Sequence, residues 1–245
     1  MFQVIILAGG MGKRMKSNLP KVLVNFKNKP MIIHIIEQAN NLNPEKIIIV
    51  IGTHSKNLIF NTIKNTLPQI FNKINFVEQQ VSRGTGDAIK YTLPKLIDNI
   101  PTLILNGDAP NIRANTLSSC FDLESNFSQI LAFTPENNFG YGRIIQKNNI
   151  LKYIREEKDC NNEEKLVTLC NTGIYCIPSN LLIKYINKLD NNNKSNEYYL
   201  TDIFSLILRD ISNTINIVTL NEENNNEVYG INTREQLIFL ENITN

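Results

Sequence analysis

The sequence of 245 residues predicts an α/β protein whose mostly parallel, mixed sheet is flanked by helices. Two observations support this fold class. Short apolar runs, typical of strands buried on both faces, alternate with longer segments whose apolar residues recur at helical spacing. Several of the apolar runs end at a glycine or a short polar turn, as strands do at the edge of such a sheet. The chain is long enough to bury a sizeable core.

The first half of the chain shows the most regular alternation. Val4–Leu7 is an apolar run that leads directly into glycines, and Pro68 ends the second amphipathic segment. The expected strands are residues 4–7, 46–52, 74–77 and 102–105, and the expected helices are residues 30–42, 55–67 and 86–97. Because strands and helices alternate, we expect these strands to pair in parallel, with helices on both faces.

The second half is less regular. Residues 140–145 are typical of a glycine-flanked turn that leads into a strand, and residues 150–155 run into the charged segment Glu156–Asp159. The other expected strands are residues 129–134, 171–177 and 215–218, and the expected helices are residues 180–189, 201–210 and 233–243. We expect this half to build a second wall opposite the N-terminal glycines.

The segment Leu7–Met15 contains three glycines within four positions, followed by cations. Gly9, Gly10 and Gly12 expose backbone N–H groups and let a ligand approach closely, since no Cβ intervenes. Lys13, Arg14 and Lys21 place positive charge beside this turn. The pattern favours a cradle for nucleotide phosphates, and a plain turn with a solvated basic loop remains the alternative. Two further candidate groups, Gly84–Gly86 and Asp108, should lie at the same edge, where ligands of such sheets bind.

Composition excludes several classes of partner. The formal charge is +2, from 25 basic and 23 acidic residues, which gives no electrostatic case for binding nucleic acid or an anionic membrane. The four cysteines form no CxxC pair and only two histidines are present, which argues against a zinc site. Scattered thiols, a strand rather than a signal peptide at the N-terminus, and no run able to span a bilayer predict a soluble cytoplasmic protein. Asparagine runs such as Asn191–Asn193 mark surface loops.

A set of motifs in order along the chain indicates a family. The motifs are Leu7–Met15, Pro20–Leu23, Gln79 with Gly84–Gly86, Gly107–Pro110, Gly140–Ile144, Glu156–Asp159, Asn171–Gly173, Asn196–Asp202 and Gly230–Arg234. Together they resemble the sugar-1-phosphate nucleotidyltransferases, and most closely the uridyltransferase half of the bacterial bifunctional N-acetylglucosamine-1-phosphate uridyltransferase/acetyltransferase. The resemblance covers nearly the whole chain. Its first motif is shared by many nucleotidyltransferases, whereas the later segments are more specific.

The resemblance implies a Rossmann-like nucleotide-diphospho-sugar transferase fold in one domain, residues 1–245. About 1–110 would bind the nucleotide, about 111–230 would bind the sugar, and 231–245 would form a closing helix. The implied reaction is Mg²⁺-assisted transfer of a uridylyl group from UTP to N-acetylglucosamine 1-phosphate, which gives UDP-N-acetylglucosamine and pyrophosphate. A phosphate monoester has its second pKa near 6, so the attacking oxygen is ionised at pH 7 and needs no general base.

The resemblance also assigns roles to individual residues. Arg14 and Lys21 would bind the triphosphate and stabilise the reacting α-phosphate, and Asp108 and Asn232 would hold Mg²⁺, which prefers such hard oxygen ligands. The residues implied to bind the nucleotide are Leu7, Ala8, Gly9, Gly10, Gln79, Gly84, Thr85 and Asp108. The residues implied to bind the sugar are Gly142, Glu156, Asn171, Glu197, Tyr199 and Thr201.

Each assignment has a structural alternative. Asp108 could be an ordinary turn aspartate, Asn232 a helix cap, and Tyr199 a core aromatic. Lys13 looks like a solvated neighbour of the catalytic cations, and Asp202 could cap a helix. The chain departs from the family pattern at Ser82–Arg83 and at Asn106, near the nucleotide, which concerns base preference rather than reaction class.

Several functional alternatives also remain open at this point. One is a related nucleotidyltransferase that uses dTTP or glucose 1-phosphate, and another is a non-catalytic sensor of sugar nucleotides. The sequence ends at Asn245, so we expect no acetyltransferase half and expect the acetylated sugar phosphate to be made elsewhere. The oligomeric state does not follow from the sequence.

Overall fold

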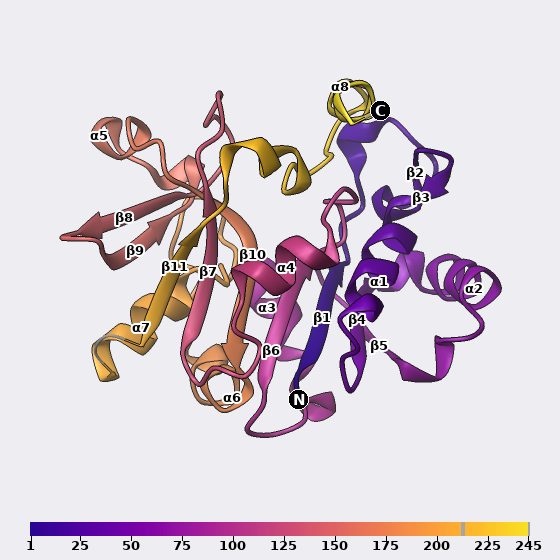
Figure 1. Ribbon diagram of the computed structural model, residues 1–245, viewed down its shortest axis with the longest axis horizontal. Coiled ribbons are helices and arrows are strands. Elements are labelled where there is room, and N and C mark those ends of the chain that lie inside the picture. Colours follow the sequence, from indigo (N-terminus) through magenta and orange to yellow (C-terminus); the bar gives the residue numbers. More distant parts are fainter. Residues whose placement is uncertain (212–213, 245) are drawn as a thin grey trace.

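The computed structural model describes residues 1–211 and 214–244, and within them one large sheet runs through the molecule (Figure 1). Its strand order is β11-β7-β10-β6-β1-β4-β5, with β8 paired to β10 and β9 paired to β8. The strands of this sheet are β1 (Gln3–Ala8), β4 (Ile47–Gly52), β5 (Ile74–Gln79), β6 (Pro101–Asn106), β7 (Ser128–Phe133), β8 (Arg143–Lys147), β9 (Ile150–Arg155), β10 (Cys170–Pro178) and β11 (Ile215–Thr219).

The helices flank this sheet, and a small hairpin lies beside it. The helices are α1 (Met31–Asn41), α2 (Lys56–Thr66), α3 (Thr85–Lys90), α4 (Ala114–Cys120), α5 (Asn162–Lys165), α6 (Ser179–Tyr185), α7 (Asp202–Asp210) and α8 (Arg234–Ile243). The hairpin consists of β2 (Asn25–Phe26) and β3 (Lys29–Pro30). None of the helices in the described residues combines the length and apolar character needed to cross a bilayer.

The sheet is parallel at one side and mixed toward the other. Strands β1, β4, β5 and β6 pair in parallel, so their carboxyl ends lie at one edge, as the alternating sequence predicts. Strand β10 runs antiparallel to β6 and β7, and β11 pairs in parallel with β7. The antiparallel hairpin of β8 and β9 extends from β10. The α/β class and its mixed sheet are confirmed.

The core lies in two layers, one on each face of the sheet. Along β1, Val4 and Ile6 pack into the cluster with helices α1, α2 and α4, whereas Ile5 packs into the cluster with α3, α6 and α7. This alternation follows from the two-residue period of a strand. Both faces of β1 are therefore buried, which explains its uninterrupted apolar run.

Two predicted helices are shorter than expected. The helix predicted over 86–97 ends at Lys90 and is followed by a 3₁₀ turn, Leu93–Lys95. Pro94 lies in that turn, and its lack of an N–H prevents an α-helix from continuing. The helix predicted over 180–189 ends at Tyr185 and continues as a 3₁₀ turn, Ile186–Lys188.

Helix α4 was not predicted, because its sequence of mostly small polar residues has low helix propensity. Tertiary contacts form it instead. Leu117 is fully buried in the core, and the backbone N–H of Ala114 donates to Oε1 of Gln38 on α1 (2.9 Å). The N-terminus of α4 is thus capped by another helix.

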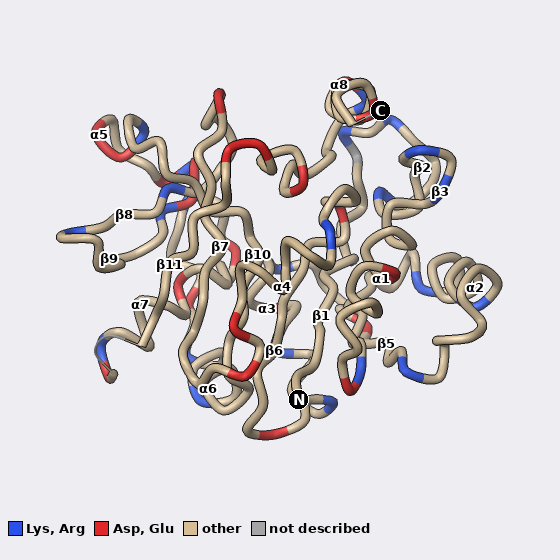
Figure 2. The backbone as a smooth tube through the Cα atoms, viewed as in Figure 1, with Lys and Arg blue, Asp and Glu red and all other residues tan. Residues whose placement is uncertain are grey.

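The C-terminal helix returns to the N-terminal half, and Figure 1 shows α8 beside the segment that follows β1. Leu240 packs in one cluster with Met15, Phe26 and Met31. The helix begins with a capping box between Thr233 and Gln236. Figure 2 shows Lys and Arg interspersed with Asp and Glu along the chain, which agrees with a formal charge of +2.

Candidate active site

The glycine turn after β1 is tightly packed against the segment that carries Lys21. Gly12 has a φ of +62°, and a Cβ there would lie 2.5 Å from Cβ of Lys21. Only glycine fits, because both the backbone conformation and the space exclude a side chain. The turn and Lys21 therefore hold each other in place at the carboxyl end of β1.

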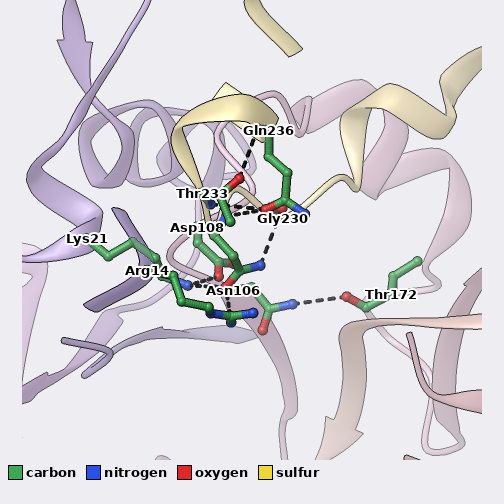
Figure 3. Close-up of polar contacts among 9 residues, drawn as sticks. Arg14, Lys21, Asn106, Asp108, Thr172, Gly230, Thr233 and Gln236 are labelled. Atoms are coloured by element: carbon green, nitrogen blue, oxygen red, sulfur yellow. Dashed lines mark hydrogen bonds and ion pairs between the residues drawn. The ribbon is translucent and has the colours of Figure 1, made fainter. Parts of the chain in front are cut away.

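Four polar side chains from three segments far apart in the sequence meet here (Figure 3). The ammonium group of Lys21 forms an ion pair with Oδ2 of Asp108, which follows β6, and donates to Oδ1 of Asn232 at 3.0 Å. Arg14 donates to the same Asn232 oxygen at 3.1 Å. The backbone N–H of Ile231 donates to the carbonyl of Asp108 at 2.8 Å, which ties the approach to α8 to the end of β6.

This cluster fits a divalent cation. The carboxylate of Asp108 and the amide oxygen of Asn232 converge on one point, since the Lys21 ammonium contacts both of them. Both are hard oxygen donors of the kind Mg²⁺ takes. No group of three or more His, Cys, Asp and Glu side chains among the described residues could hold a metal ion. Further ligands would therefore have to come from water and substrate, which is usual for Mg²⁺.

The helix-cap alternative for Asn232 is wrong. Thr233 is the N-cap residue of α8, and its side chain accepts from the backbone N–H of Gln236. The side chain of Asn232 turns away to Lys21 and Arg14. Similarly, Thr201 and not Asp202 is the N-cap residue of α7, with no capping hydrogen bond from its side chain.

A cavity of 240 Å³ opens over the carboxyl ends of β1, β5 and β6. It brings together the predicted residues Leu7, Gly9, Gly10, Lys21, Gln79, Gly84, Thr85 and Asp108. Ser82, Val22, Ala88, Asn106 and Glu197 complete its wall. Ala8 does not line it, because this last residue of β1 is buried in the core. Any contact of Ala8 with a ligand would have to use its backbone.

The turn Gly84–Gly86 is hydrogen-bonded to residues 198–200, more than a hundred positions further along the chain. Gly84 has a φ of +106°, and the N–H of Gly86 donates to the carbonyl of Tyr198 at 2.8 Å. The N–H of Leu200 donates to the Thr85 hydroxyl at 3.1 Å. The motif Asn196–Asp202 therefore lies beside the nucleotide cavity, which explains why Glu197 lines that cavity.

A second cavity, of 180 Å³, adjoins the first. Of the residues implied to bind the sugar, Gly142, Glu156, Asn171 and Thr201 line it. The Thr201 hydroxyl donates to Oε1 of Glu156 at 2.9 Å, and Nδ2 of Asn171 donates to the Tyr175 hydroxyl at 2.7 Å. Burial raises the pKa of Glu156, and the hydrogen bond from Thr201 opposes this rise. The cavity thus contains the carboxyl group of Glu156 and the amide of Asn171, each held in place by a hydrogen bond.

The two cavities share a boundary formed by Leu7, Thr85 and Asn106. Nδ2 of Asn106 donates to the carbonyl of Thr172 at 3.0 Å, so this residue links the end of β6 to β10. Gly173 has a φ of +79°, and a Cβ there would lie 2.5 Å from Nδ2 of Asn106. Asn106, a departure from the family pattern, is therefore part of the wall between the two cavities.

Two of the predicted sugar-binding residues do not line this second cavity. Glu197 lines the nucleotide cavity. Tyr199 lines a third cavity of 380 Å³, together with Asp159, Asp190 and Asp202, and this cavity shares Glu156 with the second one. Tyr199 is half-buried rather than part of the core, and burial raises its pKa to about 12. The side chain of Lys13 lies outside the described residues.

Sequence reasoning missed two positioning contacts. Buried Asp87 accepts a hydrogen bond from Gln79, and fully buried Arg143 pairs with Glu157 at 2.8 Å, next to Glu156. The position of Asp87, in the first turn of the helix after Gly84, was only a weak indication that it contacts the site. Arg143 stands at the start of a strand, where nothing in the sequence indicates burial.

Comparison with known proteins identifies the family of this chain. The family model described as nucleotidyl transferase matches residues 3–222. A protein of Acanthamoeba polyphaga mimivirus, named probable UDP-N-acetylglucosamine pyrophosphorylase, is 42% identical over 98% of this chain and 95% of its own length. The bifunctional protein GlmU is 36% identical in Janthinobacterium and 38% in Legionella pneumophila strain Corby, over 98% of this chain. The chain spans about half the length of these bifunctional relatives, 51% and 52% respectively.

A solved structure supports the fold. A Bacillus anthracis protein described as a candidate glucose-1-phosphate thymidylyltransferase superposes with a TM-score of 0.76, at 18% identity, over 99% of this chain and 95% of its own. The family model covers most of the chain, and two of these relatives are 42% and 36% identical to it over 98% of its length. This chain belongs to the nucleotidyl transferase family.

Proposed function

We propose that this protein transfers a uridylyl group from UTP to N-acetylglucosamine 1-phosphate, giving UDP-N-acetylglucosamine and pyrophosphate. The observation that supports this best is the pair of adjoining cavities, with Lys21 and Asp108 lining the first and Glu156 and Asn171 lining the second. Residues 1–110 would bind the nucleotide and residues 111–230 the sugar phosphate. The names of two relatives, a UDP-N-acetylglucosamine pyrophosphorylase and GlmU, favour this product.

The chemistry asks the protein to bring two polyanions together. The attacking phosphate oxygen is ionised at pH 7, because the second pKa of a phosphate monoester is about 6. Arg14 and Lys21 would stabilise the charge that develops at the α-phosphate, and backbone N–H groups of Gly9 and Gly10 would hold the triphosphate. The boundary formed by Leu7, Thr85 and Asn106 would lie between the two reactants and set their approach.

Asp108 and Asn232 would hold Mg²⁺, which would neutralise part of the charge on the phosphates when bound. Lys21 contacts both of these side chains, so it lies where it can contact the metal's ligands and the substrate. The flexible four-carbon stem of Lys21 would let its ammonium group turn toward a bound phosphate.

The second cavity would bind the sugar. Glu156 and Asn171 offer an acceptor and an amide for hydroxyl groups, while Thr201 fixes the orientation of the Glu156 carboxylate. Glu197 would take part from the wall of the nucleotide cavity, and Tyr199 from a third cavity that shares Glu156 with the second. The substrates and the four free cysteines fit a reducing cytoplasm, which we propose as the location.

The test is a substrate panel that reads pyrophosphate release. UTP or dTTP is combined with N-acetylglucosamine 1-phosphate or glucose 1-phosphate, each with and without Mg²⁺. We expect the fastest turnover with UTP, N-acetylglucosamine 1-phosphate and Mg²⁺. Preferred turnover of dTTP with glucose 1-phosphate would contradict the proposed substrates, and turnover in none of the combinations would contradict an enzymatic role.

A variant tests the metal assignment. Asp108→Ala should abolish Mg²⁺-dependent turnover while leaving the far-ultraviolet circular dichroism spectrum unchanged. Asp98→Ala is the matched control, because Asp98 is an exposed aspartate on the loop before β6. An Asp108→Ala rate equal to that of the control would rule out Asp108 as a metal ligand.

A further inference from the structure

The side-chain amide of Gln79 is held by two acceptors. Its Nε2 donates to Oδ2 of Asp87 at 2.9 Å and to the carbonyl of Gly84 at 3.2 Å. Gln79 and Asp87 are 5% and 8% exposed, so water contributes little to either group. Both hydrogens of the Gln79 amide are therefore used inside the protein.

Only one orientation of this amide is compatible with its neighbours. A carboxylate and a carbonyl can accept hydrogen bonds but cannot donate them. If the amide of Gln79 were flipped, its oxygen would face Oδ2 of Asp87 and the carbonyl of Gly84. A buried, unpaired carboxylate against another oxygen is strongly unfavourable. Asp87 thus excludes the flipped amide on chemical grounds.

The fixed orientation leaves one group of Gln79 for a ligand. Oε1 lies toward the glycine turn, since a Cβ at Gly9 would be 3.2 Å from it, and Gln79 and Gly9 both line the nucleotide cavity. Among the residues that the structure describes, none donates a hydrogen bond to Oε1, since both contacts of this amide involve Nε2. At this point the cavity therefore offers a bound base a hydrogen-bond acceptor, the Oε1 atom of Gln79.

We propose that Asp87 is a positioning residue that sets the base preference of the nucleotide site. By locking Gln79 with its oxygen toward the cavity, Asp87 selects a pyrimidine with a ring N–H, such as uracil. Cytosine has an unprotonated ring nitrogen at the equivalent position. This nitrogen is itself an acceptor and would face the Oε1 acceptor of Gln79 without a hydrogen between them. This inference rests on the proposed nucleotidyl transfer and assigns a residue that the reaction itself does not use.

Asp87 could instead act only on the fold. It lies in the first turn of α3, where a carboxylate interacts favourably with the helix dipole. In that case its loss would lower turnover of every nucleotide by the same factor. A positioning role makes a different prediction, because only the ratio between two bases reports the orientation of Gln79.

The experiment compares UTP with CTP by pyrophosphate release, using N-acetylglucosamine 1-phosphate and Mg²⁺. In Asp87→Asn, a side chain of nearly the same shape can donate to a flipped Gln79. Only the Gly84 carbonyl then still opposes the flip, so the donor of Gln79 can face the base in part of the molecules. We expect the kcat/KM ratio of UTP to CTP to fall about tenfold or more relative to the unmodified protein. Asp98→Asn removes the same charge at an exposed site and should leave the ratio unchanged.

The outcomes separate this inference from the proposed function. If the unmodified protein fails to use UTP, the proposed function is wrong. If it prefers UTP, and folded Asp87→Asn keeps the same ratio or loses both activities equally, Asp87 does not position Gln79. Asp87→Ser, whose hydroxyl can also donate, gives the same test if Asp87→Asn does not fold. A lowered ratio in either variant supports the proposal.

Discussion

Replacing Gly12 with alanine should uncouple the glycine turn from Lys21. The backbone of Gly12 has a φ of +62°, where an alanine costs about 1–2 kcal/mol. Its new Cβ would lie 2.5 Å from Cβ and 3.0 Å from Cα of Lys21. Because these are backbone-proximal atoms, the two segments must separate by about 1 Å, a displacement that can cost roughly 100-fold in rate when it moves a positioning group.

Two measurements test this reasoning. Thermal unfolding of Gly12→Ala should occur lower by at least the roughly 2–8 °C that the backbone cost alone implies, since 1 kcal/mol corresponds to about 2–4 °C for a chain of this size. Pyrophosphate release with UTP and N-acetylglucosamine 1-phosphate should show kcat/KM reduced about 100-fold. A Gly12→Ala protein within twofold of the unmodified kcat/KM would refute the claim that this turn positions Lys21.

Gly140 provides the matched control for stability. Its φ is +88°, but a Cβ at this position would meet nothing within 4 Å. Gly140→Ala therefore carries the backbone cost without the clash. The additional destabilisation in Gly12→Ala measures the steric part, and equal unfolding temperatures for the two variants would show that the Lys21 segment accommodates the new side chain.

The remaining predictions concern charge. Lys21→Met should reduce kcat/KM by about 10²–10³-fold, as expected for loss of a group that stabilises developing charge, and a loss below tenfold would contradict its role. Arg143→Met leaves Glu157 unpaired beside the buried site of Arg143, so unfolding should require about 3 kcal/mol less, which thermal melting would show as a drop of about 6–12 °C. Burial raises the pKa of Asp202 from 3.8 to about 6, so the folded state binds the proton more tightly and loses stability as the pH rises through this window. Asp202→Asn should accordingly melt higher than the unmodified protein at pH 8, and this gain should largely vanish at pH 4; a gain that is independent of pH would exclude ionisation of Asp202 as its cause.

The sequence predicted the parallel part of the fold well, because that part depends on local patterns. The apolar runs of β1, β4 and β6 match buried strands, and the helical spacing of α1 gives its bounds to within one residue. Prediction failed where tertiary contacts form the element. Helix α4 depends on Leu117 in the core and on a cap from Gln38, neither of which a reading of its own residues can show.

In the candidate site too, local patterns predict which residues take part, whereas tertiary contacts decide how their side chains are arranged. The motifs place Lys21, Asp108 and Asn232 in the site, but their spacing along the chain says nothing of their contacts. The structure brings Asn232 to Lys21 and Arg14 because α8 packs against the cluster of Met15 and Phe26. It also places Tyr199 in a neighbouring cavity, which shares Glu156 with the cavity that Asn171 lines.

The sequence by itself determined the α/β class, the positions of the main strands along the chain and the chemical character of the site. These properties follow from hydrophobic period and from residue types at strand ends, which are local. Only the tertiary structure decided which acceptor and donor groups face a ligand. The orientation of the Gln79 amide is set by Asp87 and Gly84, and the place of Asn106 between the cavities is set by Thr172 and Gly173. Hydrogen-bond direction depends on neighbours in space, and the folded chain alone supplies them.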